Sequence, residues 1–482
     1  MLDTVNKIYT LGSNFIQAAD GYIRGEGPDS RYPAHNRSTV QIVVKTQMAV
    51  LRPKFPDHGS PFSRKQERDR KTAAIRSAAS RRFDAQGVQG TRLEDIASDL
   101  GLTKTSISYY YASKDELAEA VFITAVKFLE EAVQDAAELS GSASGKILGL
   151  FRIYADQLID ALAGERAHPA QLQELDTLPD DAQERIVTRL NAAIGQVNDL
   201  VSDWLASSGR DLGRSEPVTF CLFSLLDWLK VSAGELSPAE FRKAADGLLD
   251  VLKTGLATPG ELSARIGVQF TDPREVPQIF DRDARNEMKR VAFLKAGIRF
   301  FNLYGFEGLS LADVAASLGV TRGAFYYHIP DKESFLDQCF DLSLEAVEAS
   351  LDSANEDYSG LEWIQRVLFD LIYMQASGMT PVIRMNLMSA LPTKRRNRYR
   401  ARLRNIWRRL GDAHDAAVAD GTAREHDSQT VEAILASVIF LNVGYTLSAA
   451  NSLDDWRMSE HPQSSTNDYL NILLYGLTTE DA

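Results

Sequence analysis

The sequence predicts an all-α protein built from two similar units. Apolar residues recur three or four positions apart through most of the chain, as Ile75, Ala79 and Phe83 do, whereas no convincing stretch of residues 63–482 alternates apolar and polar residues. A segment near residue 90 also recurs 218 residues later. The chain has 482 residues, 44% of them hydrophobic, which is more than one compact unit usually holds.

The repeat aligns residues 87–117 with residues 305–335 without a gap. Ten of these 31 positions are identical, and most others exchange similar residues, such as Ile96 for Val314. The spacing is much longer than the roughly 20–50 residues of a solenoid repeat. We therefore expect a duplicated domain.

Composition suggests where the units begin and end. Residues 1–62 have no counterpart in the repeat, and we expect a poorly ordered extension there, with Met48 as an alternative start of the chain. The segment between the copies is interrupted by Pro and Gly and is expected to be a linker. The predicted boundaries are 1–62 for the extension, 63–118 and 282–336 for two small heads, 119–257 and 337–482 for two helical bodies, and 258–281 for the linker.

Each repeated segment should begin with a short helix. In the first copy it runs from about Thr91 to Ser98, with Thr91 as its N-cap and Glu94 as the capping-box partner. Ser310 and Asp313 occupy the matching places in the second copy.

A turn and a second helix should follow. Gly101 and Gly319 can adopt the left-handed conformation that ends a helix. Thr103 and Thr321 then cap helices that start at residues 104 and 322 and end near residues 110 and 328. This order is the helix-turn-helix arrangement, whose second helix enters the major groove of DNA.

The repeated motif resembles the TetR family of transcriptional regulators. The resemblance is carried in the first copy by Ile96-Ala97, residues 101–104, Tyr109-Tyr110 and residues 114–117, and in the second copy by Val314-Ala315, residues 319–328 and residues 332–335. The first copy departs from the pattern, because Thr105 stands where the family usually has Gly and residues 108–111 read Ser-Tyr-Tyr-Tyr. The resemblance implies two TetR-like units, each with a DNA-binding head and a helical body for ligand binding and dimerisation.

The resemblance also implies which residues face DNA. Lys104 and Arg322 would reach phosphates or guanine edges, and two tyrosines would donate hydroxyls to phosphates, with packing inside the head as the alternative for both tyrosines. The predicted DNA-binding residues are Thr103, Lys104, Thr105, Ser106, Tyr109, Lys114, Thr321, Arg322, Gly323, Tyr327, His328 and Lys332. The basic segments 64–82 and 282–299 are further candidates for phosphate contact, with a solvated helix face as the alternative.

In the bodies, the resemblance implies that two late helices of each copy form the dimer face. These are expected near 217–231 and 238–253, and near 428–451 and 465–477. Because both copies lie on one chain, the simplest arrangement is an intramolecular pseudo-dimer, with further oligomerisation left open. Aromatic and Met residues are candidates to line effector pockets, with core packing as the alternative: Trp204, Phe220, Phe223 and Trp228, and Phe369, Tyr373, Met374, Met385, Met388, Phe440 and Tyr445.

One basic helix is expected at residues 394–409, which hold nine Lys/Arg and no acidic residue. Tyr399, Leu403 and Ile406 are among the apolar residues on one of its faces. Three interpretations stay open: a solvated face, an acidic neighbouring surface, or a site for an anionic effector such as an acyl-CoA, which the charges of Arg396 and Arg400 would test.

The net charge of −13 is unevenly distributed. Residues 64–117 carry 11 basic and 8 acidic side chains, or +3, and residues 282–335 carry 8 and 6, or +2. The rest of the chain therefore carries −13 − 5 = −18, so the overall acidity does not argue against DNA binding by the heads.

Other functional classes find little support. Two cysteines cannot make a disulfide framework or a cysteine zinc site, the seven histidines are scattered, and neither a phosphate loop nor a nucleophile elbow is present. We expect no enzyme activity, no cofactor or metal, no membrane span and a cytoplasmic location. The predicted function is sequence-specific binding of double-stranded DNA by a repressor that responds to a small hydrophobic effector; the alternative is an architectural or degenerate binding protein without operator recognition.

Overall fold

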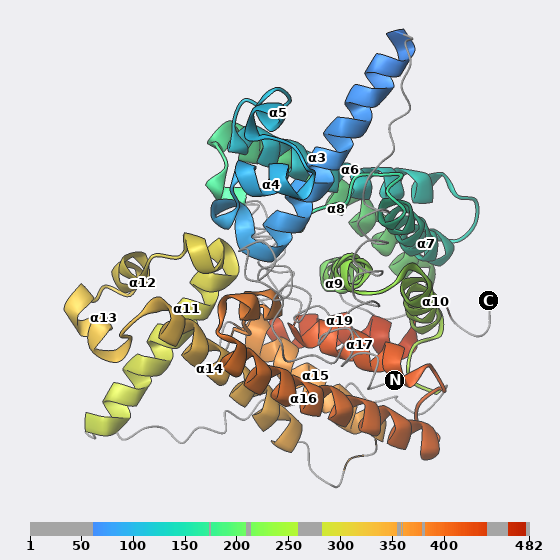
Figure 1. Ribbon diagram of the computed structural model, residues 1–482. Helices are drawn as coiled ribbons and strands as arrows, with labels where there is room; N and C mark the ends of the chain where they lie inside the picture. The colour runs from blue at the N-terminus through green and yellow to red at the C-terminus, as the bar shows by residue number, and fades with distance from the viewer. Residues whose placement is uncertain are drawn as a thin grey trace, which may run out of the picture. The chain divides into compact units, whose positions relative to one another are not determined.

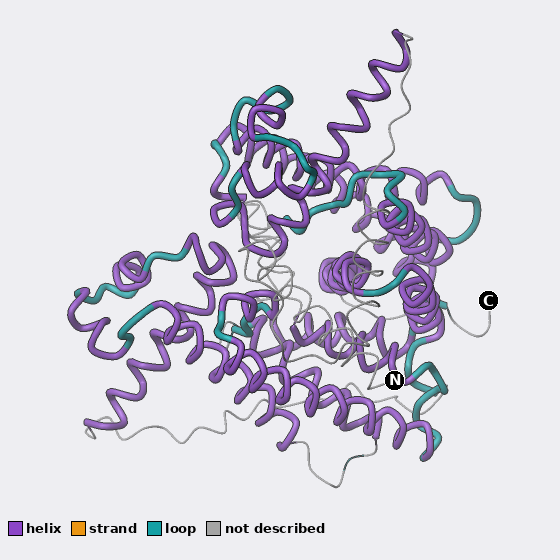
Figure 2. Tube along the Cα trace, viewed as in Figure 1, coloured by secondary structure: helices purple, strands orange, loops and turns teal. Residues whose placement is uncertain are grey.

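The computed structural model of the protein describes residues 61–172, 175–208, 214–258, 282–353, 358, 360–377, 381–440 and 461–478. Every regular element in these residues is a helix, and their one isolated β-bridge joins Ala257 to Ala423 (Figure 2). The predicted all-α class is confirmed. No helix in the same residues is long and apolar enough to cross a membrane. By its internal contacts the chain divides into two units, residues 1–67 and residues 68–482. The expected extension and the expected linker lie almost wholly outside the described residues.

The first copy has a head of three helices and a body of five α-helices (Figure 1). The head helices are α3 (Pro61–Gly90), α4 (Leu93–Asp99) and α5 (Lys104–Ser108). The body consists of α6 (Lys114–Glu138), α7 (Ala143–Leu162), the 3₁₀ turn η1 (Leu175–Thr177), α8 (Asp180–Ser208), α9 (Ser215–Glu235) and α10 (Pro238–Thr254).

The second copy repeats this order. Its head helices are α11 (Arg282–Gly308), α12 (Leu311–Ser317) and α13 (Arg322–His328). Its body consists of α14 (Lys332–Ser353), α15 (Gly360–Ala376), the 3₁₀ turn η2 (Met385–Ala390), α16 (Thr393–Ala419), α17 (Ser428–Phe440) and α19 (Pro462–Tyr475). The predicted late helices are present as α9, α10, α17 and α19, although residues 441–451 of the third prediction lie outside the described part.

The first body is held together by an apolar stripe on α6, which packs against α7 and α8. Val121, Phe122 and Val133 on that stripe are fully buried, and each contributes about 1.5–3 kcal/mol by leaving water. The helix starts at Lys114 because the Ser113 hydroxyl accepts a hydrogen bond from the Glu116 amide and so caps it. Since only five residues separate α5 from α6, this body helix directly follows the head.

The predicted capping boxes at the start of α4 and α12 are wrong. The hydroxyl of Thr91 donates backwards to the carbonyl of Gly87, so α4 begins at Leu93 without a side-chain cap. Glu94 is drawn away by an ion pair with Lys104. Ser310 does stand at the N-cap of α12, but its side chain makes no capping bond.

The two bodies pack on each other through their late helices. Both α9 and α10 contact α17 and α19. The Trp204 indole donates to the carbonyl of Leu477 at 2.8 Å, and Phe220 packs on Tyr469 with ring centroids 6.0 Å apart. Trp204 and Phe220 were candidates to line an effector pocket, with core packing as the alternative, and both side chains pack in this interface between the copies.

Backbone hydrogen bonds close this interface in a nearly two-fold pattern. The amides of Leu256 and Ala257 donate to the carbonyls of Leu473 and Leu474, whereas the amides of residues 477 and 478 donate to the carbonyls of residues 252 and 253. His426 of the second copy reaches both the Asp250 carboxylate, at 3.0 Å, and the carbonyl of residue 255, at 2.9 Å. The segments that follow α10 and α19 therefore bind each other's helix ends.

Candidate nucleic-acid interface

The first head forms a helix-turn-helix from α4 and α5. Gly101 has a φ of 65°, as predicted for the turn, and the Leu102 amide returns to the carbonyl of Ala97. The Thr103 hydroxyl caps α5 by accepting from the Ser106 amide at 3.3 Å. Ile107 is fully buried, so it anchors α5 and leaves the opposite face outward.

The second head repeats this geometry in α12 and α13. Gly319 also has a φ of 65°, and the Thr321 hydroxyl caps α13 by accepting from the Ala324 amide at 3.3 Å. Phe325 takes the place of Ile107 and packs against Phe293 at a centroid distance of 5.1 Å. The predicted turn glycines and threonine caps are thus confirmed in both copies.

Most of the predicted DNA-binding residues are exposed. Tyr109 and Tyr327 keep 74% and 83% of their surface in solvent, which argues against packing inside the head. The side chains of Ser106 and His328 are half-buried, the first beside Thr103 and the second against Phe293. The exposed members of the predicted set are Thr103, Lys104, Thr105, Tyr109, Thr321, Arg322, Gly323 and Tyr327.

The first cation of each reading helix is held differently. The Lys104 ammonium forms an ion pair with Glu94 at 2.8 Å, and this interaction lowers the pKa of the Glu94 carboxyl. The repeat places Ala312 where the first copy has Glu94. Within the part of the chain that the structure describes, Arg322 has no ion-pair partner and is exposed. Arg322 is therefore the more available of the two cations.

Lys114 and Lys332 have a role inside the heads that the sequence did not suggest. The Lys114 ammonium donates to the carbonyls of Val88, Gln89 and Thr91, at 2.9–3.4 Å. Lys332 donates to the carbonyl of Glu307 at 3.1 Å and lies over the ring of Phe306. Both lysines hold the end of the first head helix, and their contact with DNA stays a prediction.

The basic helix α16 is present, with Tyr399, Leu403 and Ile406 buried as predicted. The inner side of α16 packs against the acidic face of α14. Of the three interpretations, an acidic neighbouring surface therefore describes this side of the helix. Arg402 binds both Asp341 and Glu348, and the Tyr399 hydroxyl donates to Asp337 at 2.8 Å. The other pairs between the two helices are Arg395 with Glu333 and Asp337, Arg398 with Asp337 and Asp341, and Arg409 with Asp352.

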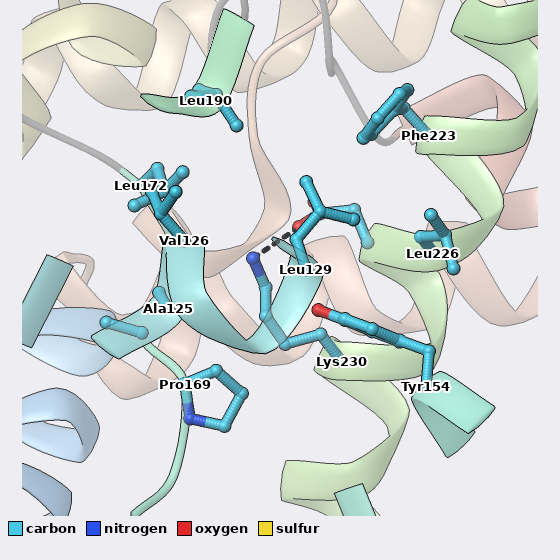
Figure 3. A pocket seen from close by; sticks show the side chains of 12 residues that line it. Ala125, Val126, Leu129, Tyr154, Pro169, Leu172, Leu190, Phe223, Leu226 and Lys230 are labelled. Atoms are coloured by element: carbon cyan, nitrogen blue, oxygen red, sulfur yellow. Dashed lines mark ion pairs between the residues drawn. The ribbon is translucent and has the colours of Figure 1, made fainter. Parts of the chain in front are cut away.

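A small cavity lies inside the first body (Figure 3). Its volume is about 60 Å³, enough for a few waters but far below the roughly 300–1,000 Å³ of a drug-sized ligand site. The Lys230 ammonium faces it and pairs with Asp227 at 2.8 Å, and the Tyr154 hydroxyl points toward the Lys230 side chain. The remaining lining is mostly apolar: Ala125, Val126, Leu129, Pro169, Ala170, Leu172, Leu190, Phe223 and Leu226.

Of the first group of expected pocket residues, only Phe223 lines this cavity. In the second body, Phe369 is buried and stacks on Tyr373 with ring centroids 5.8 Å apart, which is core packing. The side chain of Phe440 and the whole of Tyr445 lie outside the described residues.

Comparison with known proteins identifies the heads. The family described as "Bacterial regulatory proteins, tetR family" matches residues 75–121 and again residues 293–339. The chain carries two TetR-family DNA-binding domains in tandem. Each match runs from the first head helix into the first body helix, so it covers one complete helix-turn-helix.

Individual relatives are each similar to part of the chain. The HTH-type transcriptional regulator AcrR of Shigella flexneri is 37% identical over 54 residues, which are 11% of this chain and 25% of the relative. The chain thus spans about a quarter of the length of this curated relative. The solved TetR-family regulator PfmR from Thermus thermophilus is 17% identical with a TM-score of 0.31, over 37% of this chain and 92% of that chain.

A further solved structure is AibR in complex with isovaleryl coenzyme A and operator DNA. It is 17% identical with a TM-score of 0.31, and the likeness covers 37% of this chain and 96% of that chain. The two family matches, one in each head, show the family of both DNA-binding domains.

Proposed function

We propose that this protein is a transcriptional regulator that binds one operator with the two heads of a single chain. The observation that carries the proposal is the presence of two exposed reading helices, α5 and α13, on bodies whose late helices pack together within one chain. In a homodimer each subunit supplies one reading helix. Here one chain supplies both, and we place it in the cytoplasm, where it meets DNA.

The interface between the copies supports the intramolecular arrangement. It combines apolar helix packing with reciprocal backbone hydrogen bonds and the ion pair between Lys243 and Asp427 at 2.8 Å. Joining two binding partners by a linker gives them an effective concentration of about 1 mM or more. Pairing of the two heads should therefore not depend on protein concentration, so operator binding should be first order in the chain, and native mass spectrometry should find one chain for each operator.

Unlike reading helices require unlike half-sites. Residues 104–110 read Lys-Thr-Ser-Ile-Ser-Tyr-Tyr, whereas residues 322–328 read Arg-Gly-Ala-Phe-Tyr-Tyr-His. A symmetric dimer selects a palindrome because its two reading helices are identical. We expect selection from random DNA to return a non-palindromic consensus.

A swap variant provides the matched control. When residues 104–110 are replaced by the sequence of residues 322–328, the selected consensus should become palindromic with unchanged half-site spacing. A palindrome selected by the unaltered chain would contradict the proposal and indicate that two chains bind together.

We propose a small hydrophobic effector for the first body, supported by the mostly apolar lining of its cavity. The cavity must enlarge to admit it. An acyl-CoA on α16 is a less favoured effector, because its inner arginines already pair with α14. Charge reversal of Arg396 and Arg400 tests that version directly: unchanged release from DNA by an acyl-CoA would eliminate it.

The alternative function is architectural DNA binding without a specific operator. The ion pair between Lys104 and Glu94 favours it for the first head, because it reduces the positive charge offered to bases. Footprinting separates the two functions. A regulator protects one discrete site of two half-sites, whereas an architectural protein protects DNA without a preferred position.

A further inference from the structure

The cavity of the first body has a small polar cluster in an otherwise apolar wall (Figure 3). Three of its twelve lining residues are polar, namely Tyr154 on α7 and both Asp227 and Lys230 on α9. A buried polar group costs free energy unless it is hydrogen-bonded. The bonds that these three side chains make, and those they leave open, therefore indicate which ligand the cavity suits.

The Lys230 ammonium has hydrogen-bonding capacity to spare. Its Nζ atom pairs with the Asp227 carboxylate at 2.8 Å, and Asp227 is its only hydrogen-bond partner among the residues that the structure describes. An ammonium group has three N–H donors. Because only 10% of the Lys230 side chain is exposed, the other two donors depend on whatever occupies the cavity, either water or a ligand.

The Tyr154 hydroxyl offers a further donor at the same place. Its ring packs edge-on against Phe128 with centroids 6.3 Å apart, and the hydroxyl points toward the Lys230 side chain (Figure 3). In the described part of the chain this hydroxyl has no hydrogen-bond partner. Burial raises the pKa of the Tyr154 phenol, so it keeps its proton at neutral pH. One oxygen atom between the two groups could accept from both.

The charges around the cavity favour a neutral ligand. The Lys230 cation is already balanced by Asp227, and the carboxylate of Asp84 on α3 acts on it as well. A ligand carboxylate would therefore lose its hydration without gaining an unpaired cation, which is unfavourable in a buried site. A ligand ammonium would face the donors of Lys230 and Tyr154 and would compete with Lys230 for its partner.

We propose that this cavity binds an uncharged, mostly apolar molecule with a carbonyl oxygen, and that this oxygen accepts hydrogen bonds from Lys230 Nζ and Tyr154 Oη. The inference rests on the proposed function in assigning an effector to this cavity, and it adds the chemical class. The closed volume of about 60 Å³ calls for a small ligand and a wall that moves. Pro169, Ala170 and Leu172 lie outside any helix and are the part of the wall that we expect to move.

Calorimetric titration of the full-length protein without DNA tests the chemical class. Three probes share a six-carbon ring and differ in their polar group: cyclohexanone, cyclohexanecarboxylate and cyclohexylammonium. We expect cyclohexanone to bind about tenfold or more tightly than either ion, because only the ketone accepts from both donors without adding a buried charge. Tighter binding of the carboxylate, or no binding of cyclohexanone, would overturn the inference.

Two variants test the assigned residues. Tyr154→Phe should weaken cyclohexanone binding about two- to tenfold, and should move the infrared carbonyl band of bound, ¹³C-labelled cyclohexanone to higher wavenumber, because one hydrogen bond is lost. Tyr358→Phe is the matched control, because Tyr358 is exposed and does not line the cavity. Equal affinities and band positions in both variants would contradict the role of Tyr154.

Asp227→Asn tests the charge argument. This variant keeps the shape of the side chain and leaves Lys230 without its ion-pair partner. The order of the probes should then reverse, with cyclohexanecarboxylate binding more tightly than cyclohexanone. An unchanged order in a variant whose circular dichroism shows that it is folded would overturn the inference. If it does not fold, the probe order in the unaltered chain and Tyr154→Phe still decide.

Footprinting keeps this inference separate from the proposed function. A discrete operator together with failure of cyclohexanone to bind would overturn the ligand class alone. Binding of cyclohexanone as expected with no discrete operator would refute the proposed regulator and leave the carbonyl site in place.

Discussion

Gly255 and Gly476 lie face to face where the two copies meet. A Cβ atom on Gly255 would collide with the backbone of residues 474–476, and one on Gly476 would collide with the backbone of residues 253–255. Both residues also have positive φ values, 74° and 64°. Each glycine therefore serves two purposes: it turns the chain after a helix, and it lets two backbones approach closely enough to exchange hydrogen bonds.

Gly255→Ala should weaken the contact between the copies. The left-handed backbone alone costs a non-glycine residue about 1–2 kcal/mol, and the collision with fixed backbone adds to this cost. Gly164→Ala is the matched control, because Gly164 has a φ of 80° and open space around its Cβ position. Thermal unfolding should show a larger loss for Gly255→Ala than for Gly164→Ala; equal losses would mean that close approach contributes nothing.

Arg322→Ala should reduce operator affinity by about 1–3 kcal/mol without changing the thermal midpoint, because no described residue forms an ion pair with Arg322. Lys104→Ala should reduce operator affinity by less than Arg322→Ala does, because the Lys104 ammonium already forms an ion pair with Glu94. Glu94→Ala, which releases Lys104, should raise affinity and steepen its salt dependence. Titration of labelled operator at several salt concentrations provides all three values. A larger loss for Lys104→Ala than for Arg322→Ala would contradict this ranking.

Lys114→Met should destabilise the first head, because three backbone carbonyls at the end of α3 lose their donor. We expect faster hydrogen exchange in residues 86–92 in the absence of DNA. Lys332→Met provides the comparison, since Lys332 has one carbonyl partner and a ring below it. Weaker operator binding with unchanged exchange would instead make Lys114 a direct phosphate contact.

Tyr399→Phe should cost about 1–2 kcal/mol of stability in the second body, because its hydroxyl donates to Asp337 at the centre of the α14–α16 ion pairs. Arg404→Ala, on the exposed side of the same helix, should have little effect. Chemical denaturation compares the two variants. A cost for Arg404→Ala that matches the cost for Tyr399→Phe would mean that the outward cations, and not the inner pairs, stabilise α16.

Much of the fold follows from local signals in the sequence. Gly101, Gly319, Thr103 and Thr321 are recognisable because a helix turn needs a left-handed residue and a helix start needs a side-chain acceptor. The capping box at Thr91 failed because a hydroxyl has competing acceptors nearby, and the nearest was the carbonyl of Gly87.

Long-range partners were not predictable from periodicity. Trp204 and Phe220 have the apolar character of pocket residues, and only the packing of one copy on the other places them in an interface. The DNA-facing set remains a prediction, although exposure supports most of its members. One overlooked signal was the repeat spacing itself: 218 residues also separate Asp84 from Asn302, so both first head helices carry a polar residue at this position.

The contact between residues 252 and 477 also has a consequence for biosynthesis. The partners are 477 − 252 = 225 residues apart, so the carbonyl of Leu252 leaves the ribosome long before the amide of Leu477 exists. Synthesis proceeds at about 5–20 residues per second, so the apolar surface of α9 and α10 stays exposed for roughly 10–45 s before α17 and α19 can pack on it. During that interval this surface is open to other chains, and slower translation lengthens its exposure.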